Sequence, residues 1–217
     1  MNQQTAVVLG ATGLVGSHVL EQLLNDDAFI KVRALVRRPL NMQHPKLETA
    51  IVDFNNYDDY KAKLGKGDCI FCCIGATHAN VKGDKAEYRK IDFDIPVNAA
   101  RFGKEAGFEQ YLLVSAMGAN SNSRIFYSRL KGEVEELIAT FSYKCFHVFR
   151  PSFLLGNRKE QRTGESIFKA LSKALAFITP SRYKPIEAAT VAAAMIKAAK
   201  TGTPGLHINY YGEMKAK

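Results

Sequence analysis

Hydrophobic residues along the chain change their spacing several times, and these changes predict alternating strands and helices. Short runs of valine, leucine, isoleucine and phenylalanine are typical of buried strands, whereas apolar residues three and four apart mark one face of a helix. Pro96 interrupts the third of the predicted helices, so a kink or a junction is expected there. Strands are predicted at 7–9, Lys31–Pro39, Thr49–Phe54, Cys69–Gly75, Gln110–Ser115, Phe146–Arg150 and Leu206–Asn209. Helices are predicted at 14–24, Tyr57–Leu64, Glu87–Ala106, Tyr127–Thr140, Ser166–Ile178 and Pro185–Lys200.

Glycines at intervals of three residues join the first strand to the first helix in the segment Val7–Gly16. Where a strand, a glycine turn and a helix follow one another in this order, the first backbone amides of the helix point at a bound diphosphate. Glycines also serve turns that require only a positive φ angle. The helical spacing of Leu14, Leu20 and Leu23 directly behind the turn favours the dinucleotide site.

The alternation of strands and helices predicts an α/β fold with a doubly wound, mostly parallel sheet of the Rossmann type. The pattern changes beyond Pro151, where a polar, charged loop at Asn157–Glu165 precedes the last helices and a late strand. We expect residues 1–155 to form the cofactor-binding domain and residues 156–217 a small C-terminal cap on the substrate side. The two parts are expected to form a single compact unit.

The composition is ordinary for a soluble globular enzyme, with 47% hydrophobic and 24% charged residues. No apolar stretch approaches the ~20 residues of a membrane span, and the N-terminal residues lack the features of a secretory signal. A cytoplasmic location without a membrane partner is therefore expected. The net charge of +9 fits nucleic acid, an anionic membrane surface or an anionic cofactor. Because the basic residues are scattered and form no recognition motif, we favour a phosphorylated cofactor over nucleic acid.

The cysteines need a separate interpretation, because Cys69 and Cys72 have the Cys-x-x-Cys spacing of redox and zinc motifs. Residues three apart in a strand point to opposite faces, and both cysteines lie in a predicted strand together with Cys73. Cys145 lies in another apolar run. All four are therefore expected to be small core residues, and no metal site is expected.

Arg37 and Arg38 follow the second strand, where a protein specific for NAD usually has a carboxylate that binds the ribose hydroxyls. A carboxylate would repel a 2′-phosphate, whereas a guanidinium binds it through two charge-assisted hydrogen bonds. The pair therefore favours NADP over NAD. Two ordinary surface arginines at a strand end are the alternative.

Two more groups of candidate cofactor contacts depend on the glycine motif. Asp53 and Phe54 end the third strand and offer a carboxylate to the adenine amino group and an apolar face to its ring. Ile74, Gly75 and Ala76 end the fourth strand, where small residues let the backbone approach the cofactor ribose.

Tyr127 and Lys131 are candidates for acid–base chemistry, because residues four apart share one face of a helix. A nearby ammonium favours the ionised form of a phenol, so the pair suits proton transfer. Ser115 ends the fifth strand just upstream, where its hydroxyl would hold a substrate oxygen beside the phenol. This spacing also occurs on ordinary helix surfaces, but here it follows a serine at a strand end in a chain with a dinucleotide motif.

Together these motifs resemble the short-chain dehydrogenase/reductase superfamily over nearly the whole chain. The stretches Val114–Ala119, Lys131–Glu135 and Phe149–Ser152, together with Tyr127, look closest to one atypical branch. That branch holds the Tat-interacting-protein-like and NmrA-like proteins that are similar to sugar-nucleotide epimerases. The resemblance implies a Rossmann fold and a bound NADP.

The resemblance also implies which residues touch the cofactor. Arg37 would hold the 2′-phosphate and Asp53 the adenine. Residues of the first strand–helix turn would line the diphosphate, namely Gly10, Thr12, Gly13, Leu14 and Val15. The residues against the nicotinamide would be Pro151, Ser152 and Phe153.

For catalysis, the resemblance implies a set of Ser115, Tyr127 and Lys131, in which Lys131 also binds the nicotinamide ribose hydroxyls. Asp92 and Asp94 depart from the family pattern, since many relatives have an asparagine in this segment. The first hypothesis is an NADP-dependent oxidoreductase that acts on a small carbonyl or alcohol substrate. The second is an NADPH-binding sensor without turnover that acts through a protein partner, because the branch includes such regulators.

Overall fold

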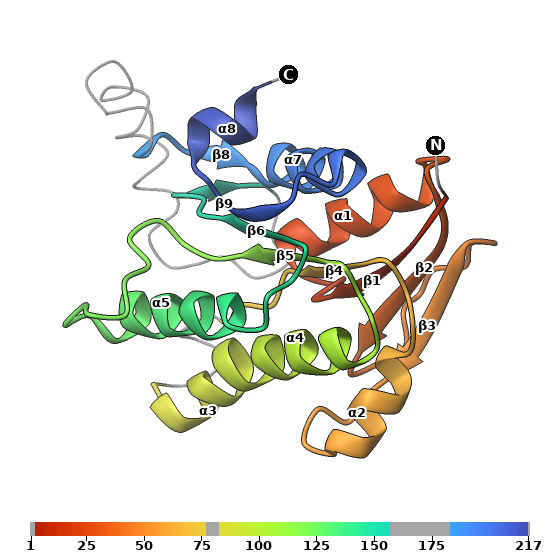
Figure 1. Cartoon of the computed structure of the whole chain (residues 1–217), viewed down its shortest axis with the longest axis horizontal. Helices are drawn as coiled ribbons and strands as arrows, with labels where there is room; N and C mark the ends of the chain where they lie inside the picture. Colours follow the sequence, from red (N-terminus) through yellow and green to blue (C-terminus); the bar gives the residue numbers. More distant parts are fainter. Residues whose placement is uncertain (1–2, 77–82, 157–182, 217) are drawn as a thin grey trace.

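Seven parallel strands form one sheet, in the order β3–β2–β1–β4–β5–β6–β9 (Figure 1). The computed structural model describes residues 3–76, 83–156 and 183–216. The strands are β1 (Gln4–Leu9), β2 (Phe29–Val36), β3 (Leu47–Ile51), β4 (Cys69–Cys72), β5 (Gln110–Val114), β6 (Cys145–Phe149) and β9 (Gly205–Asn209). The predicted doubly wound α/β fold is confirmed. The order of the strands reverses between β1 and β4, which is where such sheets bind ligands.

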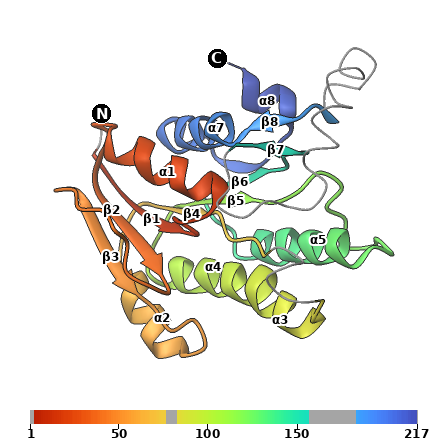
Figure 2. The same ribbon diagram turned by 180° about the vertical axis from the view of Figure 1, so that it is seen from behind.

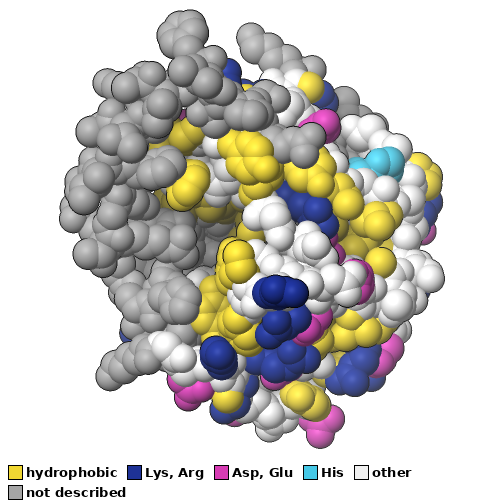
Figure 3. Space-filling model, turned by 90° about the vertical axis from the view of Figure 1, so that its left-hand side faces the viewer, with side chains coloured by type: hydrophobic (Ala, Val, Ile, Leu, Met, Phe, Trp, Pro, Cys, Tyr) yellow, Lys and Arg dark blue, Asp and Glu magenta, His cyan; other side chains and the backbone are white. Residues whose placement is uncertain are grey.

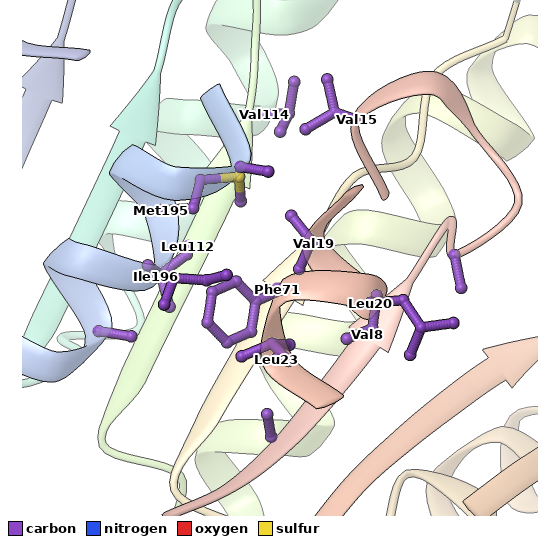
Figure 4. Close-up of a cluster of buried hydrophobic side chains, with 14 of the residues drawn as sticks. Val8, Val15, Val19, Leu20, Leu23, Phe71, Leu112, Val114, Met195 and Ile196 are labelled. Atoms are coloured by element: carbon purple, nitrogen blue, oxygen red, sulfur yellow. The ribbon is translucent and has the colours of Figure 1, made fainter. Parts of the chain in front are cut away.

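Helices cover both faces of the sheet, as Figures 1 and 2 show. One face carries α1 (Leu14–Leu24) and α7 (Ala188–Thr201). The other face carries α2 (Tyr57–Leu64), α4 (Ile95–Glu105) and α5 (Phe126–Ala139). Each layer encloses its own apolar core, because successive side chains of a strand point to opposite faces. Figure 4 shows the core beneath the first pair of helices, where Val19 on α1 and Met195 on α7 meet over Phe71 of β4.

The cysteines confirm this alternation. Cys69 belongs to the core beneath α1 and α7, and Cys72 to the core on the opposite face. All four thiols are free; Cys69, Cys72 and Cys145 are buried as predicted, whereas Cys73 is only half-buried. Burial raises the pKa of Cys69, which keeps its thiol protonated and unreactive.

The junction expected at Pro96 is a π-helical turn. A helix runs through α3 (Lys85–Arg89), the turn η1 (Lys90–Asp94) and then α4, with Pro96 in the first turn of α4. Proline has no N–H to donate to the carbonyl four residues earlier, which belongs to Asp92. The wider turn at η1 accommodates this missing bond and turns Asp92 completely inward.

Residues 183–216 are part of the sheet domain. They supply β9 at the sheet edge, α7 against α1 and the short helix α8 (Tyr211–Lys215). The short strand β8 (Ile186–Glu187) pairs with β7 (Leu154–Leu155), which follows β6. Of the residues assigned to the cap, 157–182 lie outside the described residues, as does the predicted helix at Ser166–Ile178. Among the described helices, none has the length and apolar character needed to cross a membrane.

Candidate functional site

The glycine turn after β1 lies at the point where the strand order reverses. Gly10 has a φ of +79°, and a Cβ atom there would lie 2.6 Å from the carbonyl oxygen of Cys73 beyond β4. A Cβ on Gly16 would collide with the carbonyl oxygen of Gly10. These two glycines therefore let the turn and the start of α1 pack directly against the neighbouring chain.

The first turn of α1 is open at its N-terminus. Gly13 is the N-cap residue and provides no side chain to bind the first amides of the helix. Thr12 is exposed and the Leu14 side chain lies near Gly156, whereas the Val15 side chain is buried in the core. Free amides at a helix N-terminus fit a diphosphate group, with Val15 offering only its backbone.

Arg37 and Arg38 are exposed directly after β2, as an arginine that binds a 2′-phosphate has to be. Asp53 is also exposed, after the neighbouring strand β3, and its Oδ1 accepts a hydrogen bond from the Asn55 backbone N–H at 3.0 Å. Phe54 is half-buried, with its ring edge-on to Tyr60 at a centroid distance of 4.8 Å. The predicted 2′-phosphate and adenine residues therefore follow the ends of two adjacent strands.

Tyr127 and Lys131 lie one turn apart on α5 in contrasting environments. Tyr127 is 37% exposed as a whole residue, whereas Lys131 is only 4% exposed. The Lys131 Nζ lies 2.8 Å from the Oδ1 of Asp92, whose carboxylate is completely buried. The structure thus combines an accessible phenol with a buried, paired ammonium.

Asp92 and Tyr88 together hold Ala76 in the segment that follows β4. The Ala76 N–H donates to the Oδ2 of Asp92 at 2.6 Å, and the Tyr88 hydroxyl donates to the Ala76 carbonyl at 3.3 Å. The Tyr88 ring is also edge-on to the Tyr127 ring, at 6.3 Å between centroids. The predicted ribose-facing segment at Ile74, Gly75 and Ala76 is therefore linked to the acid–base helix.

Ser115 is buried at the end of β5, where its hydroxyl donates to Glu135. The same carboxylate binds the Arg150 guanidinium, whose Nη2 is 2.5 Å from its Oε2. The Arg150 Nη1 in turn lies 3.0 Å from the Tyr210 hydroxyl. Because the Ser115 hydroxyl donates its hydrogen bond to Glu135, the Ser115 oxygen can offer a substrate only its lone pairs.

The segment predicted to face the nicotinamide connects β6 to β7. Pro151 is buried and its carbonyl accepts the Met117 N–H at 2.9 Å. The Ser152 hydroxyl donates to the carbonyl of Lys184 at 2.5 Å. The Phe153 carbonyl accepts the N–H of Ile186 at 2.9 Å, and its side chain is exposed. These contacts fix the backbone of this segment.

Two charged residues on this site were not predicted as functional, Glu135 and Arg150. Glu135 continues the row of Tyr127 and Lys131 at intervals of four residues, and it lies between the buried Val134 and the buried Ile138. A carboxylate on the apolar face of a predicted helix is a sequence signal for a buried charge pair.

Comparison with known proteins settles the family. A family model described as NAD(P)H-binding matches residues 10–201. The chain belongs to this NAD(P)H-binding family. The resemblance to atypical short-chain dehydrogenase/reductases is confirmed by its relatives. Protein HTATIP2 of Rattus norvegicus is 32% identical over 168 residues, which cover 76% of this chain and 69% of that protein.

Other comparisons agree with this NAD(P)H-binding assignment. The protein named FMP52, mitochondrial, from Candida glabrata is 39% identical over 168 residues, covering 76% of this chain and 70% of that protein. A UDP-N-acetylglucosamine 4-epimerase from Methanobrevibacter ruminantium, solved with UDP-N-acetylmuramic acid, has a TM-score of 0.73 at 20% identity. That match covers 97% of this chain and 77% of the epimerase. At this identity the epimerase shows only that the two chains share a fold.

The side of this NAD(P)H-binding protein that lies on the left in Figure 1 is drawn in Figure 3. Hydrophobic side chains gather in the middle of that face, and Lys and Arg side chains gather below them. Such a surface combines an apolar area with positive charge, which suits an anionic cofactor.

Proposed function

We propose that the protein is an NADP-dependent oxidoreductase that interconverts a small carbonyl compound and its alcohol. The observation that carries the proposal is the accessible Tyr127 phenol one helical turn from the buried Lys131 ammonium. The cofactor supplies or accepts a hydride when it is bound. Tyr127 gives a proton to the substrate oxygen during reduction and takes one from it during oxidation.

The remaining residues bind and orient. The open amides at the start of α1 hold the diphosphate, and Arg37 and Arg38 hold the 2′-phosphate, which gives the preference for NADP. Lys131 keeps a positive charge beside the phenol and binds the ribose hydroxyls. Ser115 remains the predicted orienting residue, and through its lone pairs it would accept a hydrogen bond from an alcohol substrate.

Tyr127→Phe tests the proposal, because it removes the phenol hydroxyl and keeps the ring against Tyr88. NADPH oxidation should be followed with a panel of aldehydes, ketones and quinones. We expect the variant to lose at least roughly 100-fold in rate, as is typical for a removed acid–base group. Its affinity for NADPH, measured by cofactor fluorescence, should stay close to that of the unmodified protein. A variant that keeps the full rate would show that Tyr127 is not the proton donor.

The second candidate is an NADPH-binding sensor that acts through a protein partner without turnover. The observation that favours this candidate is the hydrogen bond that the Ser115 hydroxyl donates to Glu135. The hydroxyl is therefore not available to donate to a substrate carbonyl. The unmodified protein would then bind NADPH tightly and reduce none of the compounds in the panel. A cytoplasmic location stays part of the proposal and is tested by cell fractionation, since the fungal relatives are named as mitochondrial proteins.

A further inference from the structure

Asp92 connects two parts of the site that lie far apart in the sequence, the segment that follows β4 and the helix α5. One carboxylate oxygen accepts the Ala76 N–H at 2.6 Å, and the other lies 2.8 Å from the Lys131 Nζ. We infer that Asp92 is a positioning residue that holds the Lys131 ammonium charged and fixed beside Tyr127. This inference deepens the proposed function and rests on it for its catalytic part.

Burial makes each of the two charges depend on the other. The Asp92 side chain is 0% exposed and the Lys131 side chain 5% exposed, so water does not solvate either group. A charge moved out of water is unstable unless it is paired and hydrogen-bonded. Without the carboxylate, the Lys131 ammonium would lack a counter-charge and would tend to release its proton.

The position of Asp92 follows from the π-helical turn. Pro96 cannot donate to the Asp92 carbonyl, and the helix widens at η1 and directs the Asp92 side chain toward α5. Tyr88, four residues earlier, binds the carbonyl of Ala76 while Asp92 binds its N–H. The backbone of Ala76, in the segment after β4, is therefore held at both its N–H and its carbonyl by the helix that supplies the counter-charge.

Other groups near Lys131 do not replace this carboxylate. Tyr127 on its own helix, Tyr88 on α3 and Cys72 on β4 also face it electrostatically. Burial acts to lower the pKa of Lys131, but the charge of Asp92, aided by the tyrosines, outweighs burial and raises that pKa. Of aspartate, tyrosine and cysteine, only aspartate is ordinarily ionised at neutral pH.

Asp92→Asn is the direct test, because an asparagine oxygen still accepts the Ala76 N–H while the negative charge is lost. The titration of Lys131 is followed through the NMR signals of its Cε and Hε atoms, which are assigned by their loss in Lys131→Met. In the unmodified protein Lys131 should stay protonated over the pH range in which the fold is stable. In Asp92→Asn it should release its proton within that range. Asp94→Asn removes a charge from the last residue of the same turn and should leave the titration unchanged.

Turnover gives a second measurement. In Asp92→Asn, kcat/KM should fall as the pH rises through the lowered pKa of Lys131, whereas the unmodified protein should show no such fall. If Lys131 titrates alike in both proteins, or if Asp94→Asn has the same effect, the inference is wrong. The NMR titration needs no substrate, so a shifted titration in a protein without turnover would contradict the proposed function and leave the role of Asp92 intact.

A loss of folding in Asp92→Asn would not end the test. Asp92→Asn combined with Lys131→Met removes both charges, so the double variant should fold and resist urea although Asp92→Asn alone does not. A double variant that fails to fold while Lys131→Met folds would show that Asp92 does not act through Lys131.

Discussion

In the proposed function, Arg37 and Arg38 bind the 2′-phosphate and thereby give the preference for NADP over NAD. Both are exposed after β2, and neither forms an ion pair with another described residue. Arg37→Gln with Arg38→Gln should therefore change binding with little effect on folding. Each lost charge-assisted hydrogen bond costs roughly 1.5–3 kcal/mol, so NADPH affinity should fall about tenfold or more.

NADH is the internal control for this double variant, because it lacks the 2′-phosphate. Its affinity, measured by the same fluorescence titration, should change little. An equal loss for both cofactors would mean that the two arginines contribute only general positive charge.

The individual residues of the site differ in how far the sequence could predict them. Tyr127 and Lys131 follow from a spacing within one helix, which depends only on local geometry. The pairing of Lys131 with Asp92 joins residues on separate helices, so it depends on tertiary packing. The donation from Ser115 to Glu135 has the same origin, and the sequence shows only that a carboxylate lies on a buried face.

The junction of β1 and α1 makes the clearest prediction at the scale of elements. Gly16→Ala would place a methyl group against the Gly10 carbonyl, which belongs to rigid backbone. Overpacking of this kind costs roughly 1–3 kcal/mol in the free energy of unfolding, which urea denaturation measures. NADPH affinity should fall as well, because the turn must move.

Gly212→Ala is the matched control, since a Cβ on Gly212 in α8 meets nothing within 4 Å. Alanine has the higher helix propensity, so the free energy of unfolding should stay equal or rise by up to about 1 kcal/mol. Equal destabilisation by both substitutions would refute the close contact at Gly16.

The elements themselves were predicted unevenly. The sequence located all seven strands of the main sheet, but the third was expected at Thr49–Phe54 and lies at Leu47–Ile51. Strand ends depend on the pairing partner, which a single sequence does not specify. The two-residue strands β7 and β8 were missed, because their pairing depends on a contact between Phe153 and Ile186.

At the scale of the whole molecule, a buried histidine predicts how stability depends on pH. His147 on β6 is 5% exposed and stacks on His207 of β9 at 4.7 Å between ring centroids. Burial, together with the neighbouring His207, lowers the pKa of His147 from 6.5 to about 4, although the Thr203 backbone opposes this shift. The unfolded chain therefore binds this proton more readily than the folded protein.

The direction of the pH dependence of stability follows from this difference in proton binding between the unfolded and the folded chain. The contribution of His147 to stability is complete above pH 6.5 and is lost as the pH falls toward about 4. His147→Phe keeps a ring between Phe149 and His207 and removes the titrating group. Urea denaturation between these pH values should show a smaller loss of stability in the variant, and parallel curves would contradict the assignment.

The packing of α7 on α1 has a consequence for synthesis of the chain. The apolar face of α1, with Val15 and Val19, is covered by Met195 and Ile196 of α7, which the ribosome adds long after α1. Until α7 has been made, the nascent chain exposes a hydrophobic stripe on α1 that these later residues bury. We therefore expect chaperones to bind the growing polypeptide, and early stop codons before α7 to yield aggregates.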